Sequence, residues 1–190
     1  MKIFRLIIGF VLFTVWLIGC QQQNTKDQKY VSAGRAASQK LTQTLKAALV
    51  SAITDSGVAG GVRVCSEKAL SLTAEIDALS DSITDIRRIS DKFRNPHNAP
   101  DRVDGEALSY FVNYRAEHDS LPPYYVVHGQ AAVRYYQPLI VQPLCLNCHG
   151  EPEKMDAAVL GSIRSLYPED MAVGYKSGDL RGLVRVTLIR

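Results

Sequence analysis

Two cysteines and a histidine occupy the run Cys145-Leu146-Asn147-Cys148-His149, and this run constrains the fold more than any other feature of the sequence. Thiolate sulfur and imidazole nitrogen are good ligands for transition metals, and paired thiols can also form disulfides. Because the three donors lie on one short stretch of chain, we expect them to face a single shared centre. The run could therefore serve a metal, a redox disulfide or a haem.

The N-terminus is typical of an exported lipoprotein. Lys2 and Arg5 flank the start of an apolar run, 6–18, which is shorter than the ~20 residues of a transmembrane helix and fits the central region of a signal peptide. The run leads to a small residue followed by Cys20, which resembles the cleavage site of bacterial lipoproteins. The sequence thus predicts a signal peptide over 1–19 and lipid on Cys20. An ordinary signal peptide or a short anchor is the alternative.

Beyond Cys20 the chain is predicted to contain one domain. The stretch 21–29 is polar and lacks periodicity, so we expect a flexible tether over 20–33 and a single domain over 34–190 on the periplasmic side of the membrane. Gln21 after the lipidated cysteine favours the outer membrane if the cell is Gram-negative. Basic and acidic side chains are nearly balanced, at 22 and 19, without a basic tract, so no nucleic-acid partner is expected.

The cysteine count leaves one thiol unexplained. The sequence has four cysteines, at positions 20, 65, 145 and 148. An exported protein is expected to use its cysteines in disulfides, but lipid on Cys20 leaves an odd number. At least one thiol must therefore be free or have another role.

Three interpretations of the 145–149 run are open. A redox dithiol usually begins a helix early in the fold, whereas this pair lies late in the chain. A structural zinc ion needs a fourth ligand, which Cys65 could supply. Covalent attachment of one haem c would join Cys145 and Cys148 to the haem vinyl groups and place His149 on the iron. That chemistry takes place outside the cytoplasm, where the signal peptide would send the chain.

The second axial position of such a haem has several candidates. Cys65 stands out because an exported free thiol needs protection, and burial against iron would keep it as a thiolate. The alternation of residues 62–64 predicts a short strand that ends at Cys65, with Ser66 capping the helix that follows. An inert buried Cys65 is the alternative, and the other candidate ligands are His97, His118, His128, Met155 and Met171.

Hydrophobic periodicity predicts an α+β domain. Apolar spacing of three and four residues indicates helices over 33–53, 68–79, 104–117 and 155–166. Extended segments are predicted over 83–90, 124–128, 131–141 and 182–189. Gly57 should stop the first helix, Gly129-Gln130 should form a tight turn, and 94–101 should be a loop. Helices beside late consecutive strands favour an antiparallel sheet.

Four blocks span most of the chain beyond the tether. In order along the sequence they are Val64-Cys65-Ser66, 87–101, 138–150 and 168–182. Together they resemble a family of exported c-type haem proteins that is catalogued as a domain of unknown function. The resemblance implies a PAS-like haem domain with haem attached through Cys145 and Cys148. It also implies that His149 and Cys65 are the two axial ligands. Members occur as freestanding exported proteins and as modules of signalling proteins.

A basic segment could bind the two haem propionates. Arg87, Arg88, Lys92 and Arg94 crowd this segment, and the forked guanidinium group suits carboxylates. We expect one or two of these side chains to hold propionates, with Arg88 and Arg94 favoured, and a solvated basic face is the alternative. Asp170, in the last block, has no role that the sequence explains.

A haem with thiolate and imidazole ligands favours ferric iron, so a low redox potential is expected. With both axial positions filled, no site is open for a substrate, and no catalytic residues are predicted. Two functions follow. One is electron transfer with an unidentified redox partner. The other is redox or gas sensing, in which CO or NO displaces Cys65 and a separate signalling partner responds. A haem that only stabilises the fold is a third possibility.

Overall fold

The computed structural model describes the backbone of residues 2–77 and 80–190, and the side chains of residues 27–76 and 80–190. Within these ranges it confirms an α+β architecture with a four-stranded sheet. The helices are α1 (Lys2–Glu67), α2 (Ala69–Asp77), α3 (Arg102–Glu117), α4 (Leu146–His149) and α5 (Ala157–Leu166), with short 3-10 turns η1 (Pro96–Asn98), η2 (Pro143–Cys145) and η3 (Pro152–Lys154). The strands are β1 (Ile83–Ile89), β2 (Tyr125–His128), β3 (Ala132–Ile140) and β4 (Leu180–Ile189). No helix in the described residues is long and apolar enough to cross a membrane.

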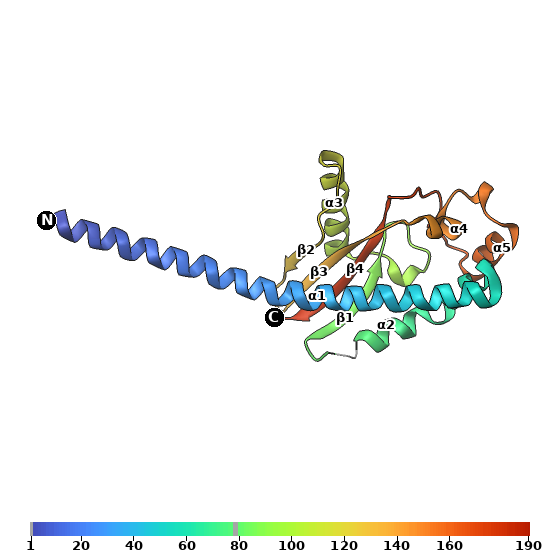
Figure 1. The fold of residues 1–190 in the computed structure, drawn as a ribbon, viewed down its shortest axis with the longest axis horizontal. Helices are drawn as coiled ribbons and strands as arrows, with labels where there is room; N and C mark the ends of the chain where they lie inside the picture. Colours follow the sequence, from blue (N-terminus) through green and yellow to red (C-terminus); the bar gives the residue numbers. More distant parts are fainter. Residues whose placement is uncertain (1, 78–79) are drawn as a thin grey trace.

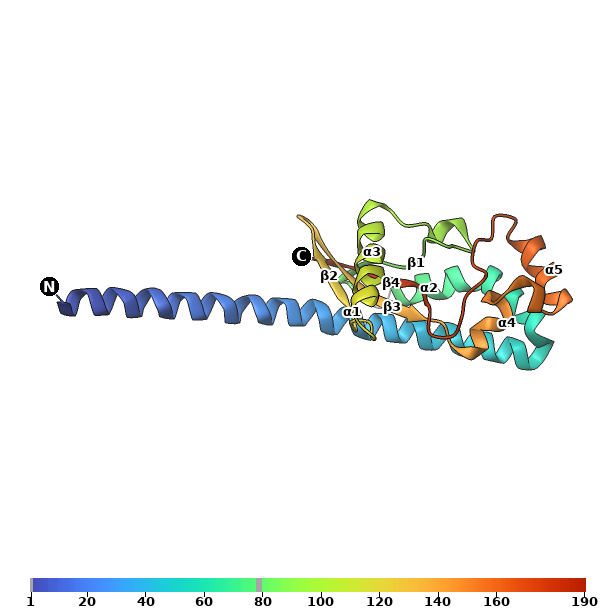
Figure 2. The same cartoon turned by 90° about the horizontal axis from the view of Figure 1, so that it is seen from above.

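The strands are arranged in the order β1-β4-β3-β2, and each neighbouring pair is antiparallel. α1 runs along the sheet, and α4 and α5 lie at the end of the domain away from the N-terminus (Figure 1 and Figure 2). Tyr135 and Tyr136 are consecutive strand residues, so their side chains point to opposite faces of the sheet. Both side chains are fully buried, because each face is covered by a helix. Tyr135 joins the core that α1 covers, and Tyr136 joins the core that α3 covers.

α1 bends near its C-terminal end and then continues to Glu67. Gly57 has φ 70° and ψ 178°, a conformation that is essentially restricted to glycine, so the predicted stop is a kink. The prediction of a short strand that ends at Cys65 is wrong, because this segment is helical. Val58 and Val62 are one helical turn apart and both pack against the core beside α5. That tertiary packing decides the conformation, since an alternation of three residues is too short to define a strand.

The packed domain begins before the predicted boundary at residue 34. Residues 27–33 belong to α1, where the sequence predicts the end of a flexible tether. Val31 is only 7% exposed, and the Asp27 carboxylate lies 3.2 Å from the Nε2 atom of His128. The predicted signal peptide, 1–19, and the lipidation site Cys20 lie outside the residues whose side chains the structure describes.

The strongly periodic elements agree with the structure, and their ends have local causes. The predicted helices over 104–117 and 155–166 correspond to α3 and α5, and the late strands correspond to β2, β3 and β4. α5 begins where the Asp156 carboxylate accepts hydrogen bonds from the backbone N–H groups of Ala158 and Val159, at 2.8 and 3.2 Å. In the predicted loop 94–101, the Asn95 side chain accepts from the N–H of His97 at 3.0 Å and starts η1.

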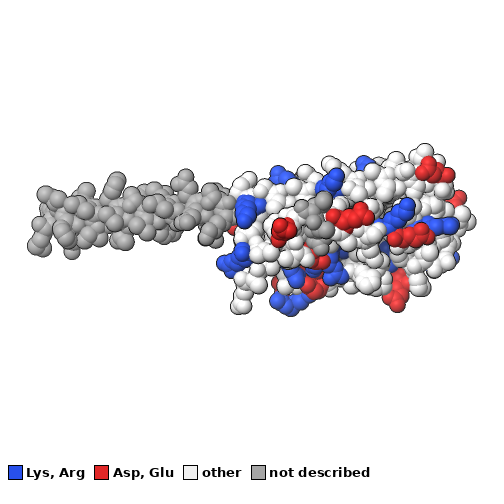
Figure 3. Space-filling view, turned by 90° about the horizontal axis from the view of Figure 1, so that it is seen from below, with Lys and Arg blue, Asp and Glu red and all other residues white. Residues whose placement is uncertain are grey.

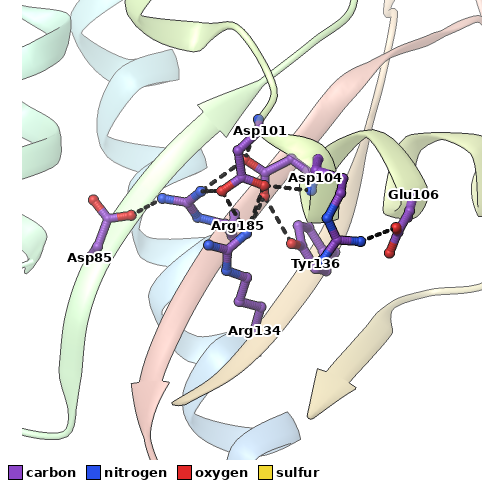
Figure 4. Close-up of polar contacts among 8 residues, drawn as sticks. Asp85, Asp101, Asp104, Glu106, Arg134, Tyr136 and Arg185 are labelled. Carbon is purple, nitrogen blue, oxygen red and sulfur yellow. Dashed lines mark hydrogen bonds and ion pairs between the residues drawn. The ribbon is translucent and has the colours of Figure 1, made fainter. Parts of the chain in front are cut away.

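A buried carboxylate joins α3 to the sheet. Asp104 is 0% exposed, and its Oδ1 accepts hydrogen bonds from the Tyr136 hydroxyl at 2.8 Å and from Nη1 of Arg134 at 3.2 Å (Figure 4). Its Oδ2 accepts from Nη1 of Arg185 at 2.8 Å. Asp101 caps α3 by accepting from the N–H of Asp104 at 2.9 Å. α3 is thereby fixed to both β3 and β4 by charged hydrogen bonds.

The face of the domain drawn in Figure 3 carries basic and acidic side chains in mixed order. Interspersed charges of both signs do not create the extended positive field that a nucleic-acid backbone requires.

α1 approaches the sheet closely at Gly34, where a Cβ atom would lie 2.3 Å from Cγ of Tyr135. Gly34→Ala is therefore expected to lower the free energy of unfolding by about 1–3 kcal/mol through overpacking. Gly161→Ala in α5 is the matched control, because a Cβ atom there meets nothing within 4 Å. Helix propensity should make the control about 1 kcal/mol more stable. Urea unfolding followed by circular dichroism measures both, and a neutral Gly34→Ala would contradict the close contact.

Candidate functional site

The four donors that the sequence predicts to act together line one cavity: Cys65, Cys145, Cys148 and His149. Cys145 ends η2, and Cys148 and His149 lie in α4, the short helix that follows. Cys65 comes from the C-terminal part of α1, beyond the kink at Gly57. The fold therefore brings two segments that lie far apart in the sequence around one enclosed space.

The rest of the cavity lining divides into an apolar set and a cationic set. The apolar side chains come mainly from α1 and are Leu49, Ile53, Val58, Val62, Leu144 and Tyr167. The polar and charged side chains are Arg88, Arg94, Asn95, Asn98, Asn147 and Arg181. A flat, largely apolar group that carries carboxylates at one edge matches this division.

His149 is held in one orientation by the segment that precedes β4. Its Nδ1 lies 2.7 Å from the carbonyl oxygen of Ala172, so Nδ1 is assigned as the protonated nitrogen that donates. The N–H of Tyr175 donates to the carbonyl oxygen of His149 at 2.9 Å. Nε2 then keeps the lone pair, which is the form in which a histidine binds a metal.

Burial and nearby charges shift the pKa values of His149 and Cys65 in opposite directions. Burial lowers the pKa of His149 well below its usual range, and the charges of Arg181 and Arg94 lower it further, so the ring is neutral at physiological pH. Burial raises the pKa of the Cys65 thiol, and the charges of Arg88 and Arg94 oppose that rise. Cys65 by itself is therefore a neutral thiol, and a bound metal would favour the thiolate.

The donors are not gathered as closely as a structural zinc ion requires. In residues 27–76 and 80–190, no group of three or more His, Cys, Asp or Glu side chains converges closely enough to hold a metal ion. Cys65, Cys145 and Cys148 are free thiols. The donors instead surround a space larger than one ion, which suits a macrocycle that carries its metal at the centre.

Arg94 has partners other than the predicted propionate. Its Nε and Nη2 atoms donate to the two carboxylate oxygens of Asp170, each at 3.0 Å. Nη2 also donates to the carbonyl oxygen of Cys148 at 2.6 Å. These bonds use Nε and Nη2, so Arg94 is directed mainly to Asp170 and to the backbone, although it also lines the cavity. The sequence could not anticipate the pairing with Asp170, and the propionate contact of Arg94 stays a prediction.

Arg88 and Arg181 are better placed to bind anions. Both line the cavity that contains Cys65 and His149, and a smaller one beside His149. None of the ion pairs among the described side chains includes either residue. Burial lowers the pKa of both guanidinium groups, yet arginine stays charged at physiological pH. Both side chains are partly buried and lie outside these ion pairs, so this wall of the cavity suits a group with negative charge.

Arg181 was missing from the predicted site residues. It lies at the start of β4, far along the chain from the basic segment that contains Arg88. Its Nη1 donates to the hydroxyl oxygen of Ser90 at 2.9 Å and to the carbonyl oxygen of Lys92 at 3.1 Å. The pairing of β1 with β4 creates this neighbourhood, and the only signal for Arg181 in the sequence is its place in the last of the four blocks.

The other candidate iron ligands lie away from the cavity. Its lining contains none of the following described residues: His97, His118, His128, Met155 and Met171. His118 stacks on Tyr114 with ring centroids 3.9 Å apart. Met155 packs beside the core between α1 and α5 and lines a neighbouring cavity of about 740 Å³. Cys65 is thus the candidate that shares its cavity with His149.

Comparisons with known proteins agree with this arrangement. The family model described as Tll0287-like matches residues 20–188, a region that contains every donor of the cavity. Among solved structures, the chain is similar to the crystal structure of the cyanobacterial heme-protein Tll0287, with a TM-score of 0.59 and 26% sequence identity. That alignment covers 79% of this chain and 91% of the other. No curated protein matches the chain.

Proposed function

The chain belongs to the Tll0287-like family, and on this premise we propose that it binds one haem covalently through Cys145 and Cys148. The observation that carries the proposal is the single cavity shared by these thiols with His149 and Cys65. The similar solved protein is described as a heme-protein, which supports the same cofactor here. The apolar and cationic sets of the lining also match the body and the propionate edge of a haem.

His149 and Cys65 are the axial ligands in this proposal. The hydrogen bond from Nδ1 of His149 to Ala172 leaves Nε2 available for iron. Cys65 is the remaining thiol in the cavity, and iron would hold it as a thiolate. When bound, the haem supplies a reversible one-electron couple, and a thiolate ligand favours its ferric form. The potential should therefore lie below that of a cytochrome with histidine and methionine ligands.

Arg88 and Arg181 are the proposed propionate partners. Both line the two cavities beside His149, and Asn98 lines the same two cavities. Two carboxylates would give these two partly buried guanidinium groups ion-pair partners inside the cavity. Arg88 keeps the role that the sequence predicts, and Arg181 replaces Arg94.

The function that fits best is electron transfer by an exported, lipid-anchored haem protein. Ligands on both sides of the iron leave no open position for a substrate, which suits an electron carrier better than an enzyme. The family match begins at residue 20, where the mature chain with lipid on Cys20 is predicted to start. The donor and acceptor proteins would be separate partners on the periplasmic side of the membrane.

One observation favours redox or gas sensing as a second candidate function. Cys65 lies on the short part of α1 beyond Gly57, whose backbone conformation separates this part from the rest of the helix. Displacement of Cys65 by CO or NO could therefore move this segment and signal to a partner. Rapid one-electron cycling without gas binding would favour the carrier, and loss of the thiolate band on adding CO to the reduced protein would favour the sensor.

Covalent attachment is tested in cells that mature c-type cytochromes. The exported wild type is expected to keep its haem after denaturation, as detected by haem staining of a denaturing gel and by the pyridine haemochrome spectrum. The double variant Cys145→Ser/Cys148→Ser should lose at least about 90% of the stained haem, because both thioether bonds are removed. Cys65→Ser is the matched control and should keep the covalent haem. A wild type without bound haem would refute the proposed function.

A further inference from the structure

The carbonyl oxygen of Ala172 accepts hydrogen bonds from two different side chains. One donor is Nδ1 of His149 at 2.7 Å, and the other is Nη2 of Arg94 at 3.3 Å. A carbonyl oxygen has two lone pairs and can accept both bonds. The imidazole proposed to bind iron therefore shares its acceptor with a guanidinium cation.

Asp170 completes the arrangement. Its carboxylate forms the two-point ion pair with Arg94, and its Oδ1 also accepts from the N–H of Ala172 at 2.9 Å. The side chains of Arg94 and Asp170 are only 10% and 8% exposed, so solvent screens their charges weakly. Arg94 reaches the peptide beside His149 as well, through the carbonyl oxygen of Cys148 at 2.6 Å. The ion pair is thus bonded both to the peptide before His149 and to the acceptor of its ring.

We propose that Arg94 and Asp170 are positioning residues that set the donor strength of His149 and thereby the redox potential of the haem. This inference rests on the proposed function, because it requires iron on Nε2 of His149. A stronger acceptor for Nδ1–H makes the imidazole a better donor to ferric iron. Arg94 weakens that acceptor by binding the same oxygen. Asp170 limits this effect because it partly neutralises the guanidinium group.

The two residues should act on the potential with opposite signs. Arg94→Gln removes the cation and its charged hydrogen bond to the carbonyl oxygen of Ala172, and both changes favour ferric iron, so the potential should become more negative. Asp170→Asn keeps the shape and an acceptor oxygen but leaves the charge of Arg94 uncompensated, so the potential should become more positive. We expect each variant to change the ferric-to-ferrous ratio at fixed potential roughly tenfold, which is about 59 mV for one electron.

A purely structural brace predicts a different pattern. If the ion pair only holds Ala172 against α4, either substitution breaks the same bridge and loosens the same histidine. Both potentials would then move in the same direction. The signs of the two shifts therefore distinguish electronic tuning from bracing.

Potentiometric titration of the haem-loaded protein tests the proposal. The set consists of the wild type, Arg94→Gln, Arg94→Lys and Asp170→Asn. Arg94→Lys keeps the cation, so its potential should stay closer to that of the wild type than the potential of Arg94→Gln does. Glu106→Gln removes an equal charge from an exposed ion pair on α3 and should leave the potential unchanged. Proton NMR of Nδ1–H of His149 in the ferrous protein should show a stronger hydrogen bond in Arg94→Gln.

Opposite shifts of Arg94→Gln and Asp170→Asn, with the expected change at Nδ1–H, would support the proposal. Shifts of the same sign, or no shift, would overturn it. If Arg94→Gln fails to fold, the potentials of Arg94→Lys and Asp170→Asn test the proposal instead. A potential of Asp170→Asn at or below that of the wild type would then overturn it. Failure of the proposed function is recognisable separately, because the wild type itself would then carry no covalent haem.

Discussion

Replacing Asp104 by alanine is expected to lower the free energy of unfolding by about 3–5 kcal/mol, because it removes one partner from a buried ionic network. The side chain of Asp104 accepts from Tyr136, Arg134 and Arg185 at once. Burial raises the pKa of Tyr136, so its hydroxyl keeps the proton that it donates. Alanine would leave this hydroxyl and the buried guanidinium group of Arg185 without their shared acceptor.

Two further variants calibrate this result. Asp104→Asn keeps an acceptor oxygen but loses the charge, so a smaller loss of about 1–3 kcal/mol is expected. Glu106→Ala breaks an ion pair with Arg102 on the same helix, two residues along the chain from Asp104. Those two side chains are 78% and 61% exposed, so the change should stay within about 0.5 kcal/mol. Chemical denaturation measures all three, and an Asp104→Ala loss below about 1 kcal/mol would show that the network is not what fixes α3.

Cys65→Ala should leave the haem covalently bound and change its electronic spectrum. The attachment thiols, Cys145 and Cys148, are untouched, but the proposed thiolate ligand is lost. Because a thiolate favours ferric iron, its removal should raise the potential. We expect at least a tenfold change in the ferric-to-ferrous ratio at fixed potential, or about 59 mV. Absorption and electron paramagnetic resonance spectra of the ferric protein, followed by redox titration, measure both effects.

Ser66→Ala is the matched control for Cys65→Ala. Ser66 is the next residue of α1, and its hydroxyl donates to the carbonyl oxygen of Arg63 at 2.8 Å. The control should therefore keep the spectrum and the potential of the wild type. If the spectrum of Cys65→Ala is unaltered, Cys65 is not a ligand of the iron, and the proposal of covalent attachment is unaffected.

Strong periodicity made most of the fold predictable. α3, α5 and the late strands follow from patterns that extend over many residues, so short-range spacing was sufficient there. The segment around Cys65 failed because Val62 and Val64 alternate over too few residues to distinguish a strand from a helix. Val31 was placed in a tether because its neighbours are polar, and only the packing of α1 against the sheet shows that this position is buried.

The site was predictable where its residues are adjacent in the sequence. Cys145, Cys148 and His149 lie within five residues, so the sequence already indicates that they act together. The polar surroundings were not predictable, because they depend on partners that tertiary structure supplies. Arg94 meets Asp170 only after the loop before β4 folds back towards α4, and Arg181 reaches the cavity only through strand pairing. The cluster of basic residues in one short segment therefore indicated a positively charged side of the cavity. It did not indicate which of these residues lack an ion-pair partner.

The separation of Cys65 and His149 along the chain has a consequence for unfolding. Between them lie β1, α3, β2 and β3, so an iron atom bound to both residues would close a long loop. Such a closure restricts the unfolded chain as a disulfide does, and its effect grows slowly with loop length. The thioether bonds would fix the haem at one end of the loop permanently, while one iron–sulfur bond would hold the other end. The strength of that single bond would then determine whether most of the sheet unfolds as a cross-linked chain or as an open one.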